Sequence, residues 1–171
     1  MKQVKLYNVI FPIWLLLFFP PVIFITLIGN FVIDSLVLLA CFFLFELTNK
    51  QKNLKEFYKS SILKVWIFGF LADILGAAIL FVLGILGDSL GLPSELITGI
   101  DYDPFNNPVA VIVIIFAMLV SATLIFVLNF KFTFKKQIGE EKLRFKAAIT
   151  IAIITMPWTF LLPTKWFYHG F

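Results

Sequence analysis

Long apolar runs alternate with short polar segments along the whole sequence. Three runs have clear limits, at residues 61–86, 108–130 and 147–163, and a longer run extends from about residue 9 to residue 47. A bilayer core about 30 Å thick is crossed by about 20 helical residues, so each run is long enough to span a membrane, the third only just. The pattern predicts an all-α fold, a single polytopic bundle of transmembrane helices.

The longest run, residues 9–47, predicts two spans rather than one. Its 39 residues match two helices joined by a tight turn. Gly29 and Asn30 provide that turn, because both residue types tolerate left-handed backbone. A single long, tilted helix over residues 20–47 is the alternative. The expected spans are residues 9–28 and 30–47, which makes five spans in total.

The charged segments between the runs assign each connection to one side of the membrane. Segments 48–60 and 131–146 are rich in lysine, whereas segment 87–107 has four acids and no lysine or arginine. Because basic connections stay in the cytoplasm, the acidic segment is expected outside. Five spans then place the N-terminus, with Lys2 and Lys5, in the cytoplasm and the C-terminus outside. No small-residue cleavage site follows the first apolar segment, so we expect a retained span and not a signal peptide.

The composition fits a membrane protein and argues against nucleic acid as a partner. Hydrophobic residues make up 61% of the chain and charged residues 14%, whereas about a quarter of a soluble domain is charged. The net charge of +4 comes from basic residues beside the apolar runs, so it does not indicate nucleic-acid binding. One cysteine, Cys41, and one histidine, His169, are too few for a disulfide or a Cys/His metal site. We expect a multi-pass protein of a bacterial plasma membrane with no cofactor, in contact with lipid and with a membrane-protein partner or a second copy.

Small residues recur at helical spacing within the apolar runs. In lipid, helices associate through close packing of small side chains and through hydrogen bonds, because one apolar surface is no better a partner than another. Pro20, Pro21 and Pro157 interrupt the same runs, and each frees the carbonyl four residues earlier. Either a neighbouring group donates a hydrogen bond to the freed carbonyl, or the opened backbone lines a polar cavity. We assign helix packing to the residues of the stripes: Gly69, Gly76, Ala77, Gly84, Ala117, Ser121, Ala152 and Thr155.

Two acidic residues, Asp34 and Asp73, lie inside predicted spans. A carboxylate within a span costs about 2.5–3.5 kcal/mol on insertion scales, so such a residue is a functional candidate. We predict that Asp73 is a proton or cation relay, and Asp34 and Asn30 are further polar candidates. In a five-span bundle the two acids differ in depth by about 14 Å, too far apart to share a proton. The alternative interpretation is a hydrogen-bonded acid that only fixes helix packing.

The segment LNFKFTFK, residues 128–135, ends one of the apolar runs. It resembles the Asn, aromatic, Thr-Phe, basic motif of small four-span membrane proteins implicated in moving polyprenyl-linked sugars. Those proteins have two spans after the motif and this chain has one. A helix end with interfacial aromatic residues and positive anchors has the same features, so the chain is not assigned to that family.

Two classes of function remain open. The first is a small carrier, flippase or transporter subunit that uses Asp73. The second is a non-catalytic assembly, immunity or regulatory protein that acts through lateral helix contacts. An enzyme is a weaker third, because the sequence shows no nucleophile–base pair and no phosphate-binding loop. A polar cavity at Asp73 favours the first class, and a dry bundle with an exposed stripe of small residues favours the second.

Overall fold

The computed structural model describes residues 12–47 and 53–167, and within these residues the chain forms helices and no strands. Four helical stretches are long and apolar enough to cross a bilayer, and they give the chain the architecture of a multi-pass membrane protein. The predicted all-α class is confirmed. The elements are α1 (Ile13–Leu16), α2 (Val22–Leu44), α3 (Leu54–Leu86), α4 (Ser94–Asp101), η2 (Pro104–Asn106), α5 (Pro108–Leu128), η3 (Asn129–Thr133), α6 (Glu141–Thr155), η4 (Trp158–Leu161) and η5 (Thr164–Trp166).

The predicted turn at Gly29 and Asn30 is wrong, because both residues lie inside helix α2. The chain breaks earlier, at Pro20 and Pro21, where two consecutive residues lack a backbone donor. Within an apolar run, a continuous helix satisfies every backbone group, whereas a turn would leave several exposed to lipid. The described part of this run, residues 12–47, therefore contains one membrane-length helix. The five predicted spans are not confirmed, because the described residues contain four.

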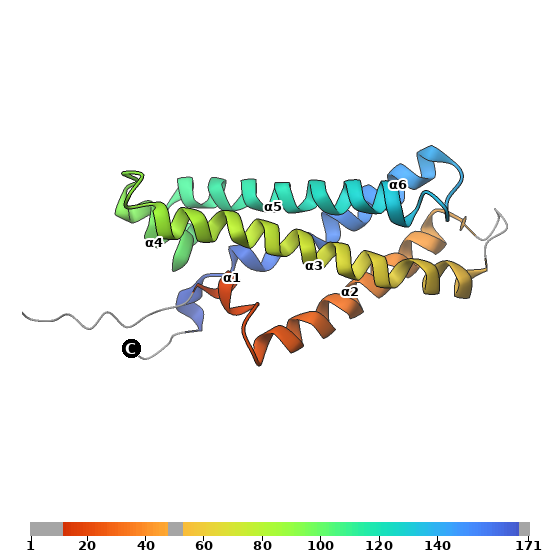
Figure 1. The fold of residues 1–171 in the computed structure, drawn as a ribbon, viewed down its shortest axis with the longest axis horizontal. Coiled ribbons are helices and arrows are strands. Elements are labelled where there is room, and N and C mark those ends of the chain that lie inside the picture. Colours follow the sequence, from red (N-terminus) through yellow and green to blue (C-terminus); the bar gives the residue numbers. More distant parts are fainter. Residues whose placement is uncertain (1–11, 48–52, 168–171) are drawn as a thin grey trace, which may run out of the picture.

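The described chain begins and ends at the same end of the bundle, together with α4 (Figure 1). The Ile13 amide donates to Thr164 Oγ1 at 2.9 Å, and Trp14 Nε1 donates to the Ile100 carbonyl at 3.2 Å. We call this the acidic end, because it includes segment 87–107. The lysine-rich connection between α5 and α6 lies at the opposite, basic end, beside the start of α3. The opposite placement of the two termini is thus not confirmed, and the predicted cytoplasmic N-terminus falls on residues outside the described part.

The helix bounds differ from the predicted spans where a capping residue starts a helix or a proline ends one. Helix α3 begins at Leu54 because the Asn53 side chain accepts a hydrogen bond from the Lys55 amide at 3.0 Å, so half of the predicted connection 48–60 is helical. Helix α6 begins at Glu141 and ends at Thr155, two residues before Pro157. The connection 87–107 is not only turns, because it contains α4 and η2.

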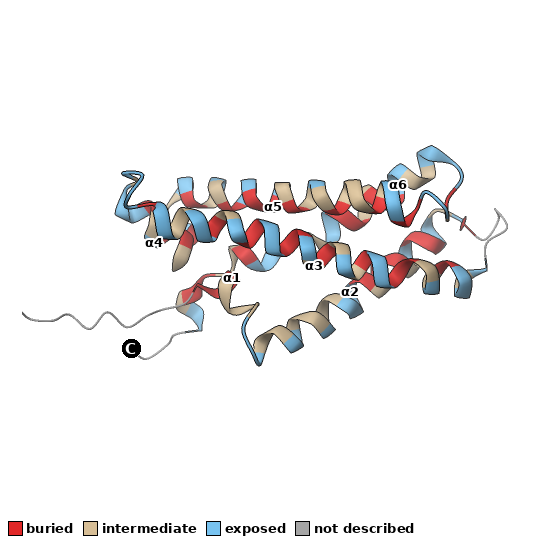
Figure 2. Ribbon diagram, viewed as in Figure 1, coloured by how far each residue is buried: buried red, intermediate tan, exposed pale blue. Residues whose placement is uncertain are grey.

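Helices α3 and α5 lie side by side and pack through small residues (Figure 1). Ser121 Oγ donates to the Ala72 carbonyl at 2.8 Å. A Cβ at Gly76 would lie only 2.3 Å from Ser121 Oγ. The buried faces of the two helices point towards each other (Figure 2). Of the residues assigned to packing, those buried within this chain are Gly69, Gly76, Ala77, Ala117, Ser121 and Ala152.

Helix α2 packs on the rest of the bundle only through its second half. Its buried residues are Asp34, Val37, Leu38, Cys41 and Phe42, and none precedes Asp34. The first half diverges from the bundle and carries no buried residue (Figures 1 and 2). Trp66 bridges part of this separation, because its Nε1 donates to the Leu27 carbonyl at 3.0 Å. The divergence leaves space beside α3 and α6 at the level of Asp34.

Asp101, the last residue of α4, lies against α3 at the acidic end. Its carboxyl oxygens would be 3.4 Å from a Cβ at Gly84, and its Oδ1 has no hydrogen-bond partner among the described residues. Burial raises the pKa of Asp101 from 3.8 to about 6. The folded state therefore binds the proton more tightly than the unfolded chain does. This contribution to stability, about 1–3 kcal/mol, is complete below about pH 4 and is lost as the pH rises through the folded pKa.

We expect Asp101→Asn to remove this pH dependence. As the pH rises from about 4 to about 7, the thermal unfolding midpoint of the wild type in detergent should fall relative to that of the variant. Asp88→Asn is the matched control, because Asp88 is exposed in the turn after α3 and its removal should leave the wild-type profile unchanged. Parallel profiles for the wild type and Asp101→Asn would contradict the assignment.

Candidate functional site

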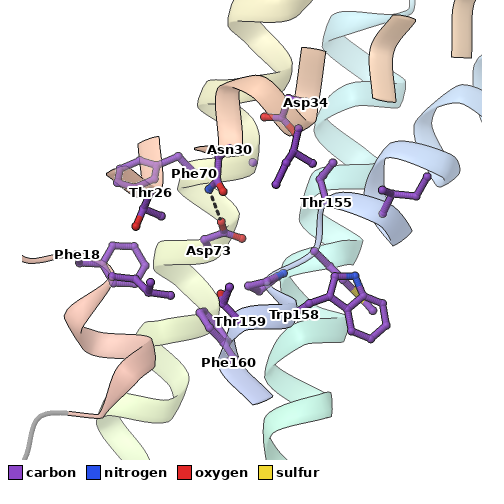
Figure 3. A pocket seen from close by; sticks show the side chains of 16 residues that line it. Phe18, Thr26, Asn30, Asp34, Phe70, Asp73, Thr155, Trp158, Thr159 and Phe160 are labelled. Atoms are coloured by element: carbon purple, nitrogen blue, oxygen red, sulfur yellow. Dashed lines mark hydrogen bonds between the residues drawn. The ribbon is translucent and has the colours of Figure 1, made fainter. Parts of the chain in front are cut away.

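A cavity of about 140 Å³ lies between α2, α3 and the interrupted end of α6 (Figure 3). It occupies the space left by the divergence of α2 from the bundle. Polar and aromatic side chains line it together, and none of its lining residues is basic. The polar lining residues are Thr26, Asn30, Asp34, Asp73, Thr155 and Thr159, and the aromatic ones are Phe18, Phe70, Trp158 and Phe160.

Helix α2 contributes a polar stripe to this cavity. Thr26, Asn30 and Asp34 are spaced by four residues, so they lie on one face of a continuous helix. The Thr26 hydroxyl donates to the Val22 carbonyl at 3.0 Å, one turn earlier. Because α2 continues through Gly29, the stripe points into the bundle and not towards a surface turn.

Asp73 lies at the centre of the cavity (Figure 3). Asn30 Nδ2 donates to Asp73 Oδ2 at 3.5 Å, the long limit of a hydrogen bond, and this contact joins α2 to α3. Asp73 Oδ1 is buried and has no partner among the described residues. Asp73 is 13 residues from the last residue of α3, Leu86, which places it about 20 Å from that helix end. The cavity therefore holds a carboxyl oxygen with unused hydrogen-bonding capacity near the middle of the span.

Asp34 lies beside Gly69 of α3, about one helical turn from Asp73, rather than near an outer turn. It is only 3% exposed, and its Oδ2 would be 3.7 Å from a Cβ at Gly69. The missing side chain at Gly69 lets the carboxyl approach the α3 backbone. Asp34 is 10 residues from Leu44, the nearer end of α2, which is about 15 Å of helix. The predicted depth difference between the two acids rested on the turn at residues 29–30 and is wrong.

The end of α6 supplies the third wall. Pro157 stops the helix, so the last carbonyls have no partner within the helix, and they carry the negative end of its dipole. Trp158 Nε1 donates to the Ile153 carbonyl at 3.2 Å, and Thr155 Oγ1 donates to the Ile151 carbonyl at 2.9 Å. The Trp158 indole thus satisfies the Ile153 carbonyl, which Pro157 leaves without its helical partner. The helix end adds negative potential to a cavity that already holds two carboxyl groups.

The chemistry of this cavity favours positive charge. Two carboxyl groups, a carboxamide oxygen and a helix C-terminus are hydrogen-bond acceptors and attract a proton or a cation. With no lysine or arginine in the lining, nothing within the cavity neutralises them. Opposite charges attract strongly in a low-dielectric environment. A positively charged ligand therefore compensates the carboxyl groups for the hydration that they lose on burial.

The structure brings Asp73, Asp34, Asn30, Gly69 and Thr155 together at this cavity. Gly84, predicted on the same face of α3 as Asp73, does not line the cavity: it lies against the Asp101 carboxyl near the acidic end. The aromatic lining was not predicted. A signal for part of it was present in the sequence, because Phe70 precedes Asp73 by three residues and Trp158 directly follows the helix-breaking Pro157.

No protein-family model, curated protein or solved structure matches this chain. The assignment of a function therefore depends on the geometry of the cavity.

Proposed function

We propose that the protein is a small carrier of the cell membrane in which Asp73, with Asp34 and Asn30, binds a proton or another cation during its passage across the bilayer. The observation that supports it is the buried Asp73 carboxyl, which lines an acidic cavity near mid-span and whose Oδ1 has no hydrogen-bond partner among the described residues. Intramembrane acids that face the bundle interior are typical of ion and proton pathways. A broken helix end beside them is typical of carrier sites, where irregular backbone lines a cavity.

The alternative, an assembly or regulatory protein, would need an unused packing face. The small residues at which α3 and α5 meet are instead occupied within this chain: Gly76 contacts Ser121 and Phe160, and Ala117 is fully buried. Their close packing explains these residues without a partner. The acidic cavity at Asp73 and the occupied small-residue interface between α3 and α5 together favour a carrier.

The test is cation flux in liposomes that contain the purified protein. Acid-loaded vesicles with an internal pH-sensitive dye receive an external monovalent cation, and proton release is followed. We offer Na⁺, K⁺, tetramethylammonium and hexyltrimethylammonium in turn. Release above that of protein-free vesicles is expected for at least one of them. Because Asp73→Asn removes the charge but keeps the shape, it should reduce release by about tenfold or more.

Asp88→Asn is the matched control, since it removes an exposed acid at the end of α3 and leaves the cavity unchanged. It should release protons at the wild-type rate. Equal rates for the wild type and Asp73→Asn, or no protein-dependent release for any cation, would overturn the carrier proposal.

A further inference from the structure

The cavity has a mouth on the side of the bundle, bordered by exposed apolar side chains. Three apolar lining residues at its edge are strongly exposed: Ile33 of α2 (47%), Ile154 of α6 (49%) and Trp158 of η4 (52%). They come from α2, from the end of α6 and from the η4 turn that follows Pro157. In a membrane such residues contact acyl chains. The direct neighbour of this mouth is therefore lipid and not water.

Apolar side chains also border the side of the cavity that faces the acidic end. Leu17 and Phe18, from the segment between α1 and α2, line it there, and the Phe18 ring contacts Phe70 with a centroid separation of 5.9 Å. Among the described residues, this wall presents only apolar side chains to a small hydrated cation. An amphiphile already dissolved in the bilayer has a shorter path, through the mouth between Ile33 and Trp158.

Aromatic rings and carboxyl groups surround the same space. Phe18, Phe70, Trp158 and Phe160 line the same cavity as the carboxyl groups of Asp34 and Asp73 (Figure 3). Aromatic faces attract alkylammonium groups through their quadrupoles, most strongly where water is excluded. A hard metal ion would prefer a cage of oxygen atoms without rings. The combination fits an organic ammonium group.

We infer that the solute of this cavity is an amphiphilic ammonium compound, which enters from the lipid phase with its charged head at Asp73 and Asp34 and its hydrocarbon tail in the bilayer. The inference builds on the proposed function, because it names the solute class of the same site. A phosphate or sulfate head is disfavoured, because it would meet two carboxyl groups and no basic residue.

The experiment measures binding and requires no transport. The full-length protein is placed in lipid nanodiscs, and a dodecyltrimethylammonium probe brominated on its tail is titrated in while tryptophan fluorescence is followed. Saturable quenching is expected for the wild type, because Trp158 lies at the mouth. Unlabelled dodecyltrimethylammonium should compete. Dodecyl sulfate, with the same tail and the opposite charge, should not, and tetramethylammonium, with the same head and no tail, should compete about a hundredfold less well.

Two pairs of variants separate the head site from the mouth. Asp73→Asn should weaken binding about tenfold or more, and Asp88→Asn should not change it. Ile33→Trp fills the mouth and should weaken binding to a similar extent, whereas Ile28→Trp, on the same helix but outside the cavity lining, should not. All four variants are first checked for wild-type helix content and a single elution peak, so a folding failure is recognised separately.

The outcomes distinguish this inference from the carrier proposal. Competition by dodecyl sulfate, or insensitivity to both Ile33→Trp and Asp73→Asn, overturns the ammonium site and its lateral entry. Equal competition by tetramethylammonium indicates a water-borne cation, so it overturns lateral entry while the carrier proposal stands. Binding that depends on Asp73, together with no protein-dependent flux, supports the site and overturns the carrier.

Discussion

Gly76→Ile is expected to prevent the bundle from folding. A Cβ at this position would lie 2.3 Å from Ser121 Oγ, 3.0 Å from the Phe160 ring and 3.3 Å from the Ala117 carbonyl. One of these contacts is backbone and cannot rotate away, and Ser121 is held by its bond to the Ala72 carbonyl. Overpacking a tight interface costs about 1–3 kcal/mol, and more where backbone is involved. We expect loss of the monodisperse protein in detergent, or an unfolding midpoint far below that of the wild type.

Gly29→Ala is the matched control for this prediction. Gly29 is also a helical glycine in an apolar run, but a Cβ there meets nothing within 4 Å. The alanine should stabilise α2 by about 0.5–1 kcal/mol, because glycine is the poorer helix former. It also tests the continuity of α2, since alanine is unsuited to a left-handed turn. A destabilised Gly29→Ala would restore the predicted turn, and a well-folded Gly76→Ile would contradict the packing of α3 on α5.

The apolar runs predicted the helical class and most helix positions, because the length and hydrophobicity of a span are local properties. The limits of α5 match the predicted span 108–130 closely. What the sequence did not reveal was the meaning of Gly29 and Asn30. These residue types favour turns in water. In lipid, leaving the backbone groups of a turn unpaired costs more free energy than placing two poor helix formers in a helix. The Asn30 side chain, moreover, has a partner on α3, and no local pattern could show that contact.

The candidate site was predicted as individual residues and not as a constellation. Asp34 and Asp73 were each identified from the cost of a buried carboxyl, but the false turn separated them in depth. With α2 continuous, the spacing of Thr26, Asn30 and Asp34 alone predicts one polar face. The aromatic wall from η4 depends on how the chain folds back after Pro157. That arrangement is tertiary, so the sequence pattern could mark the break but not its neighbours.

Removing the polar cluster altogether is expected to make the protein more stable. The polar cluster consists of Asn30, Asp34 and Asp73, the amide and carboxyl side chains that line the cavity. The triple change Asn30→Leu, Asp34→Leu and Asp73→Leu replaces all three, so no amide or carboxyl group in the cavity is left unpaired. Buried acids cost about 2.5–3.5 kcal/mol each on insertion scales, and the cavity of about 140 Å³ has room for larger side chains. We expect a gain of about 2–4 kcal/mol, seen as a higher thermal unfolding midpoint in detergent, together with loss of cation flux.

The sign of this change separates a functional site from a structural one. If the acids fix helix packing, their removal lowers the unfolding midpoint, and the carrier proposal loses its physical basis. If they are retained for a ligand, stability rises while flux and ammonium binding disappear, because a site that holds charge in lipid is a cost to the fold. Asp88→Leu, at an exposed acid, controls for the general effect of adding an apolar side chain and should not raise the midpoint.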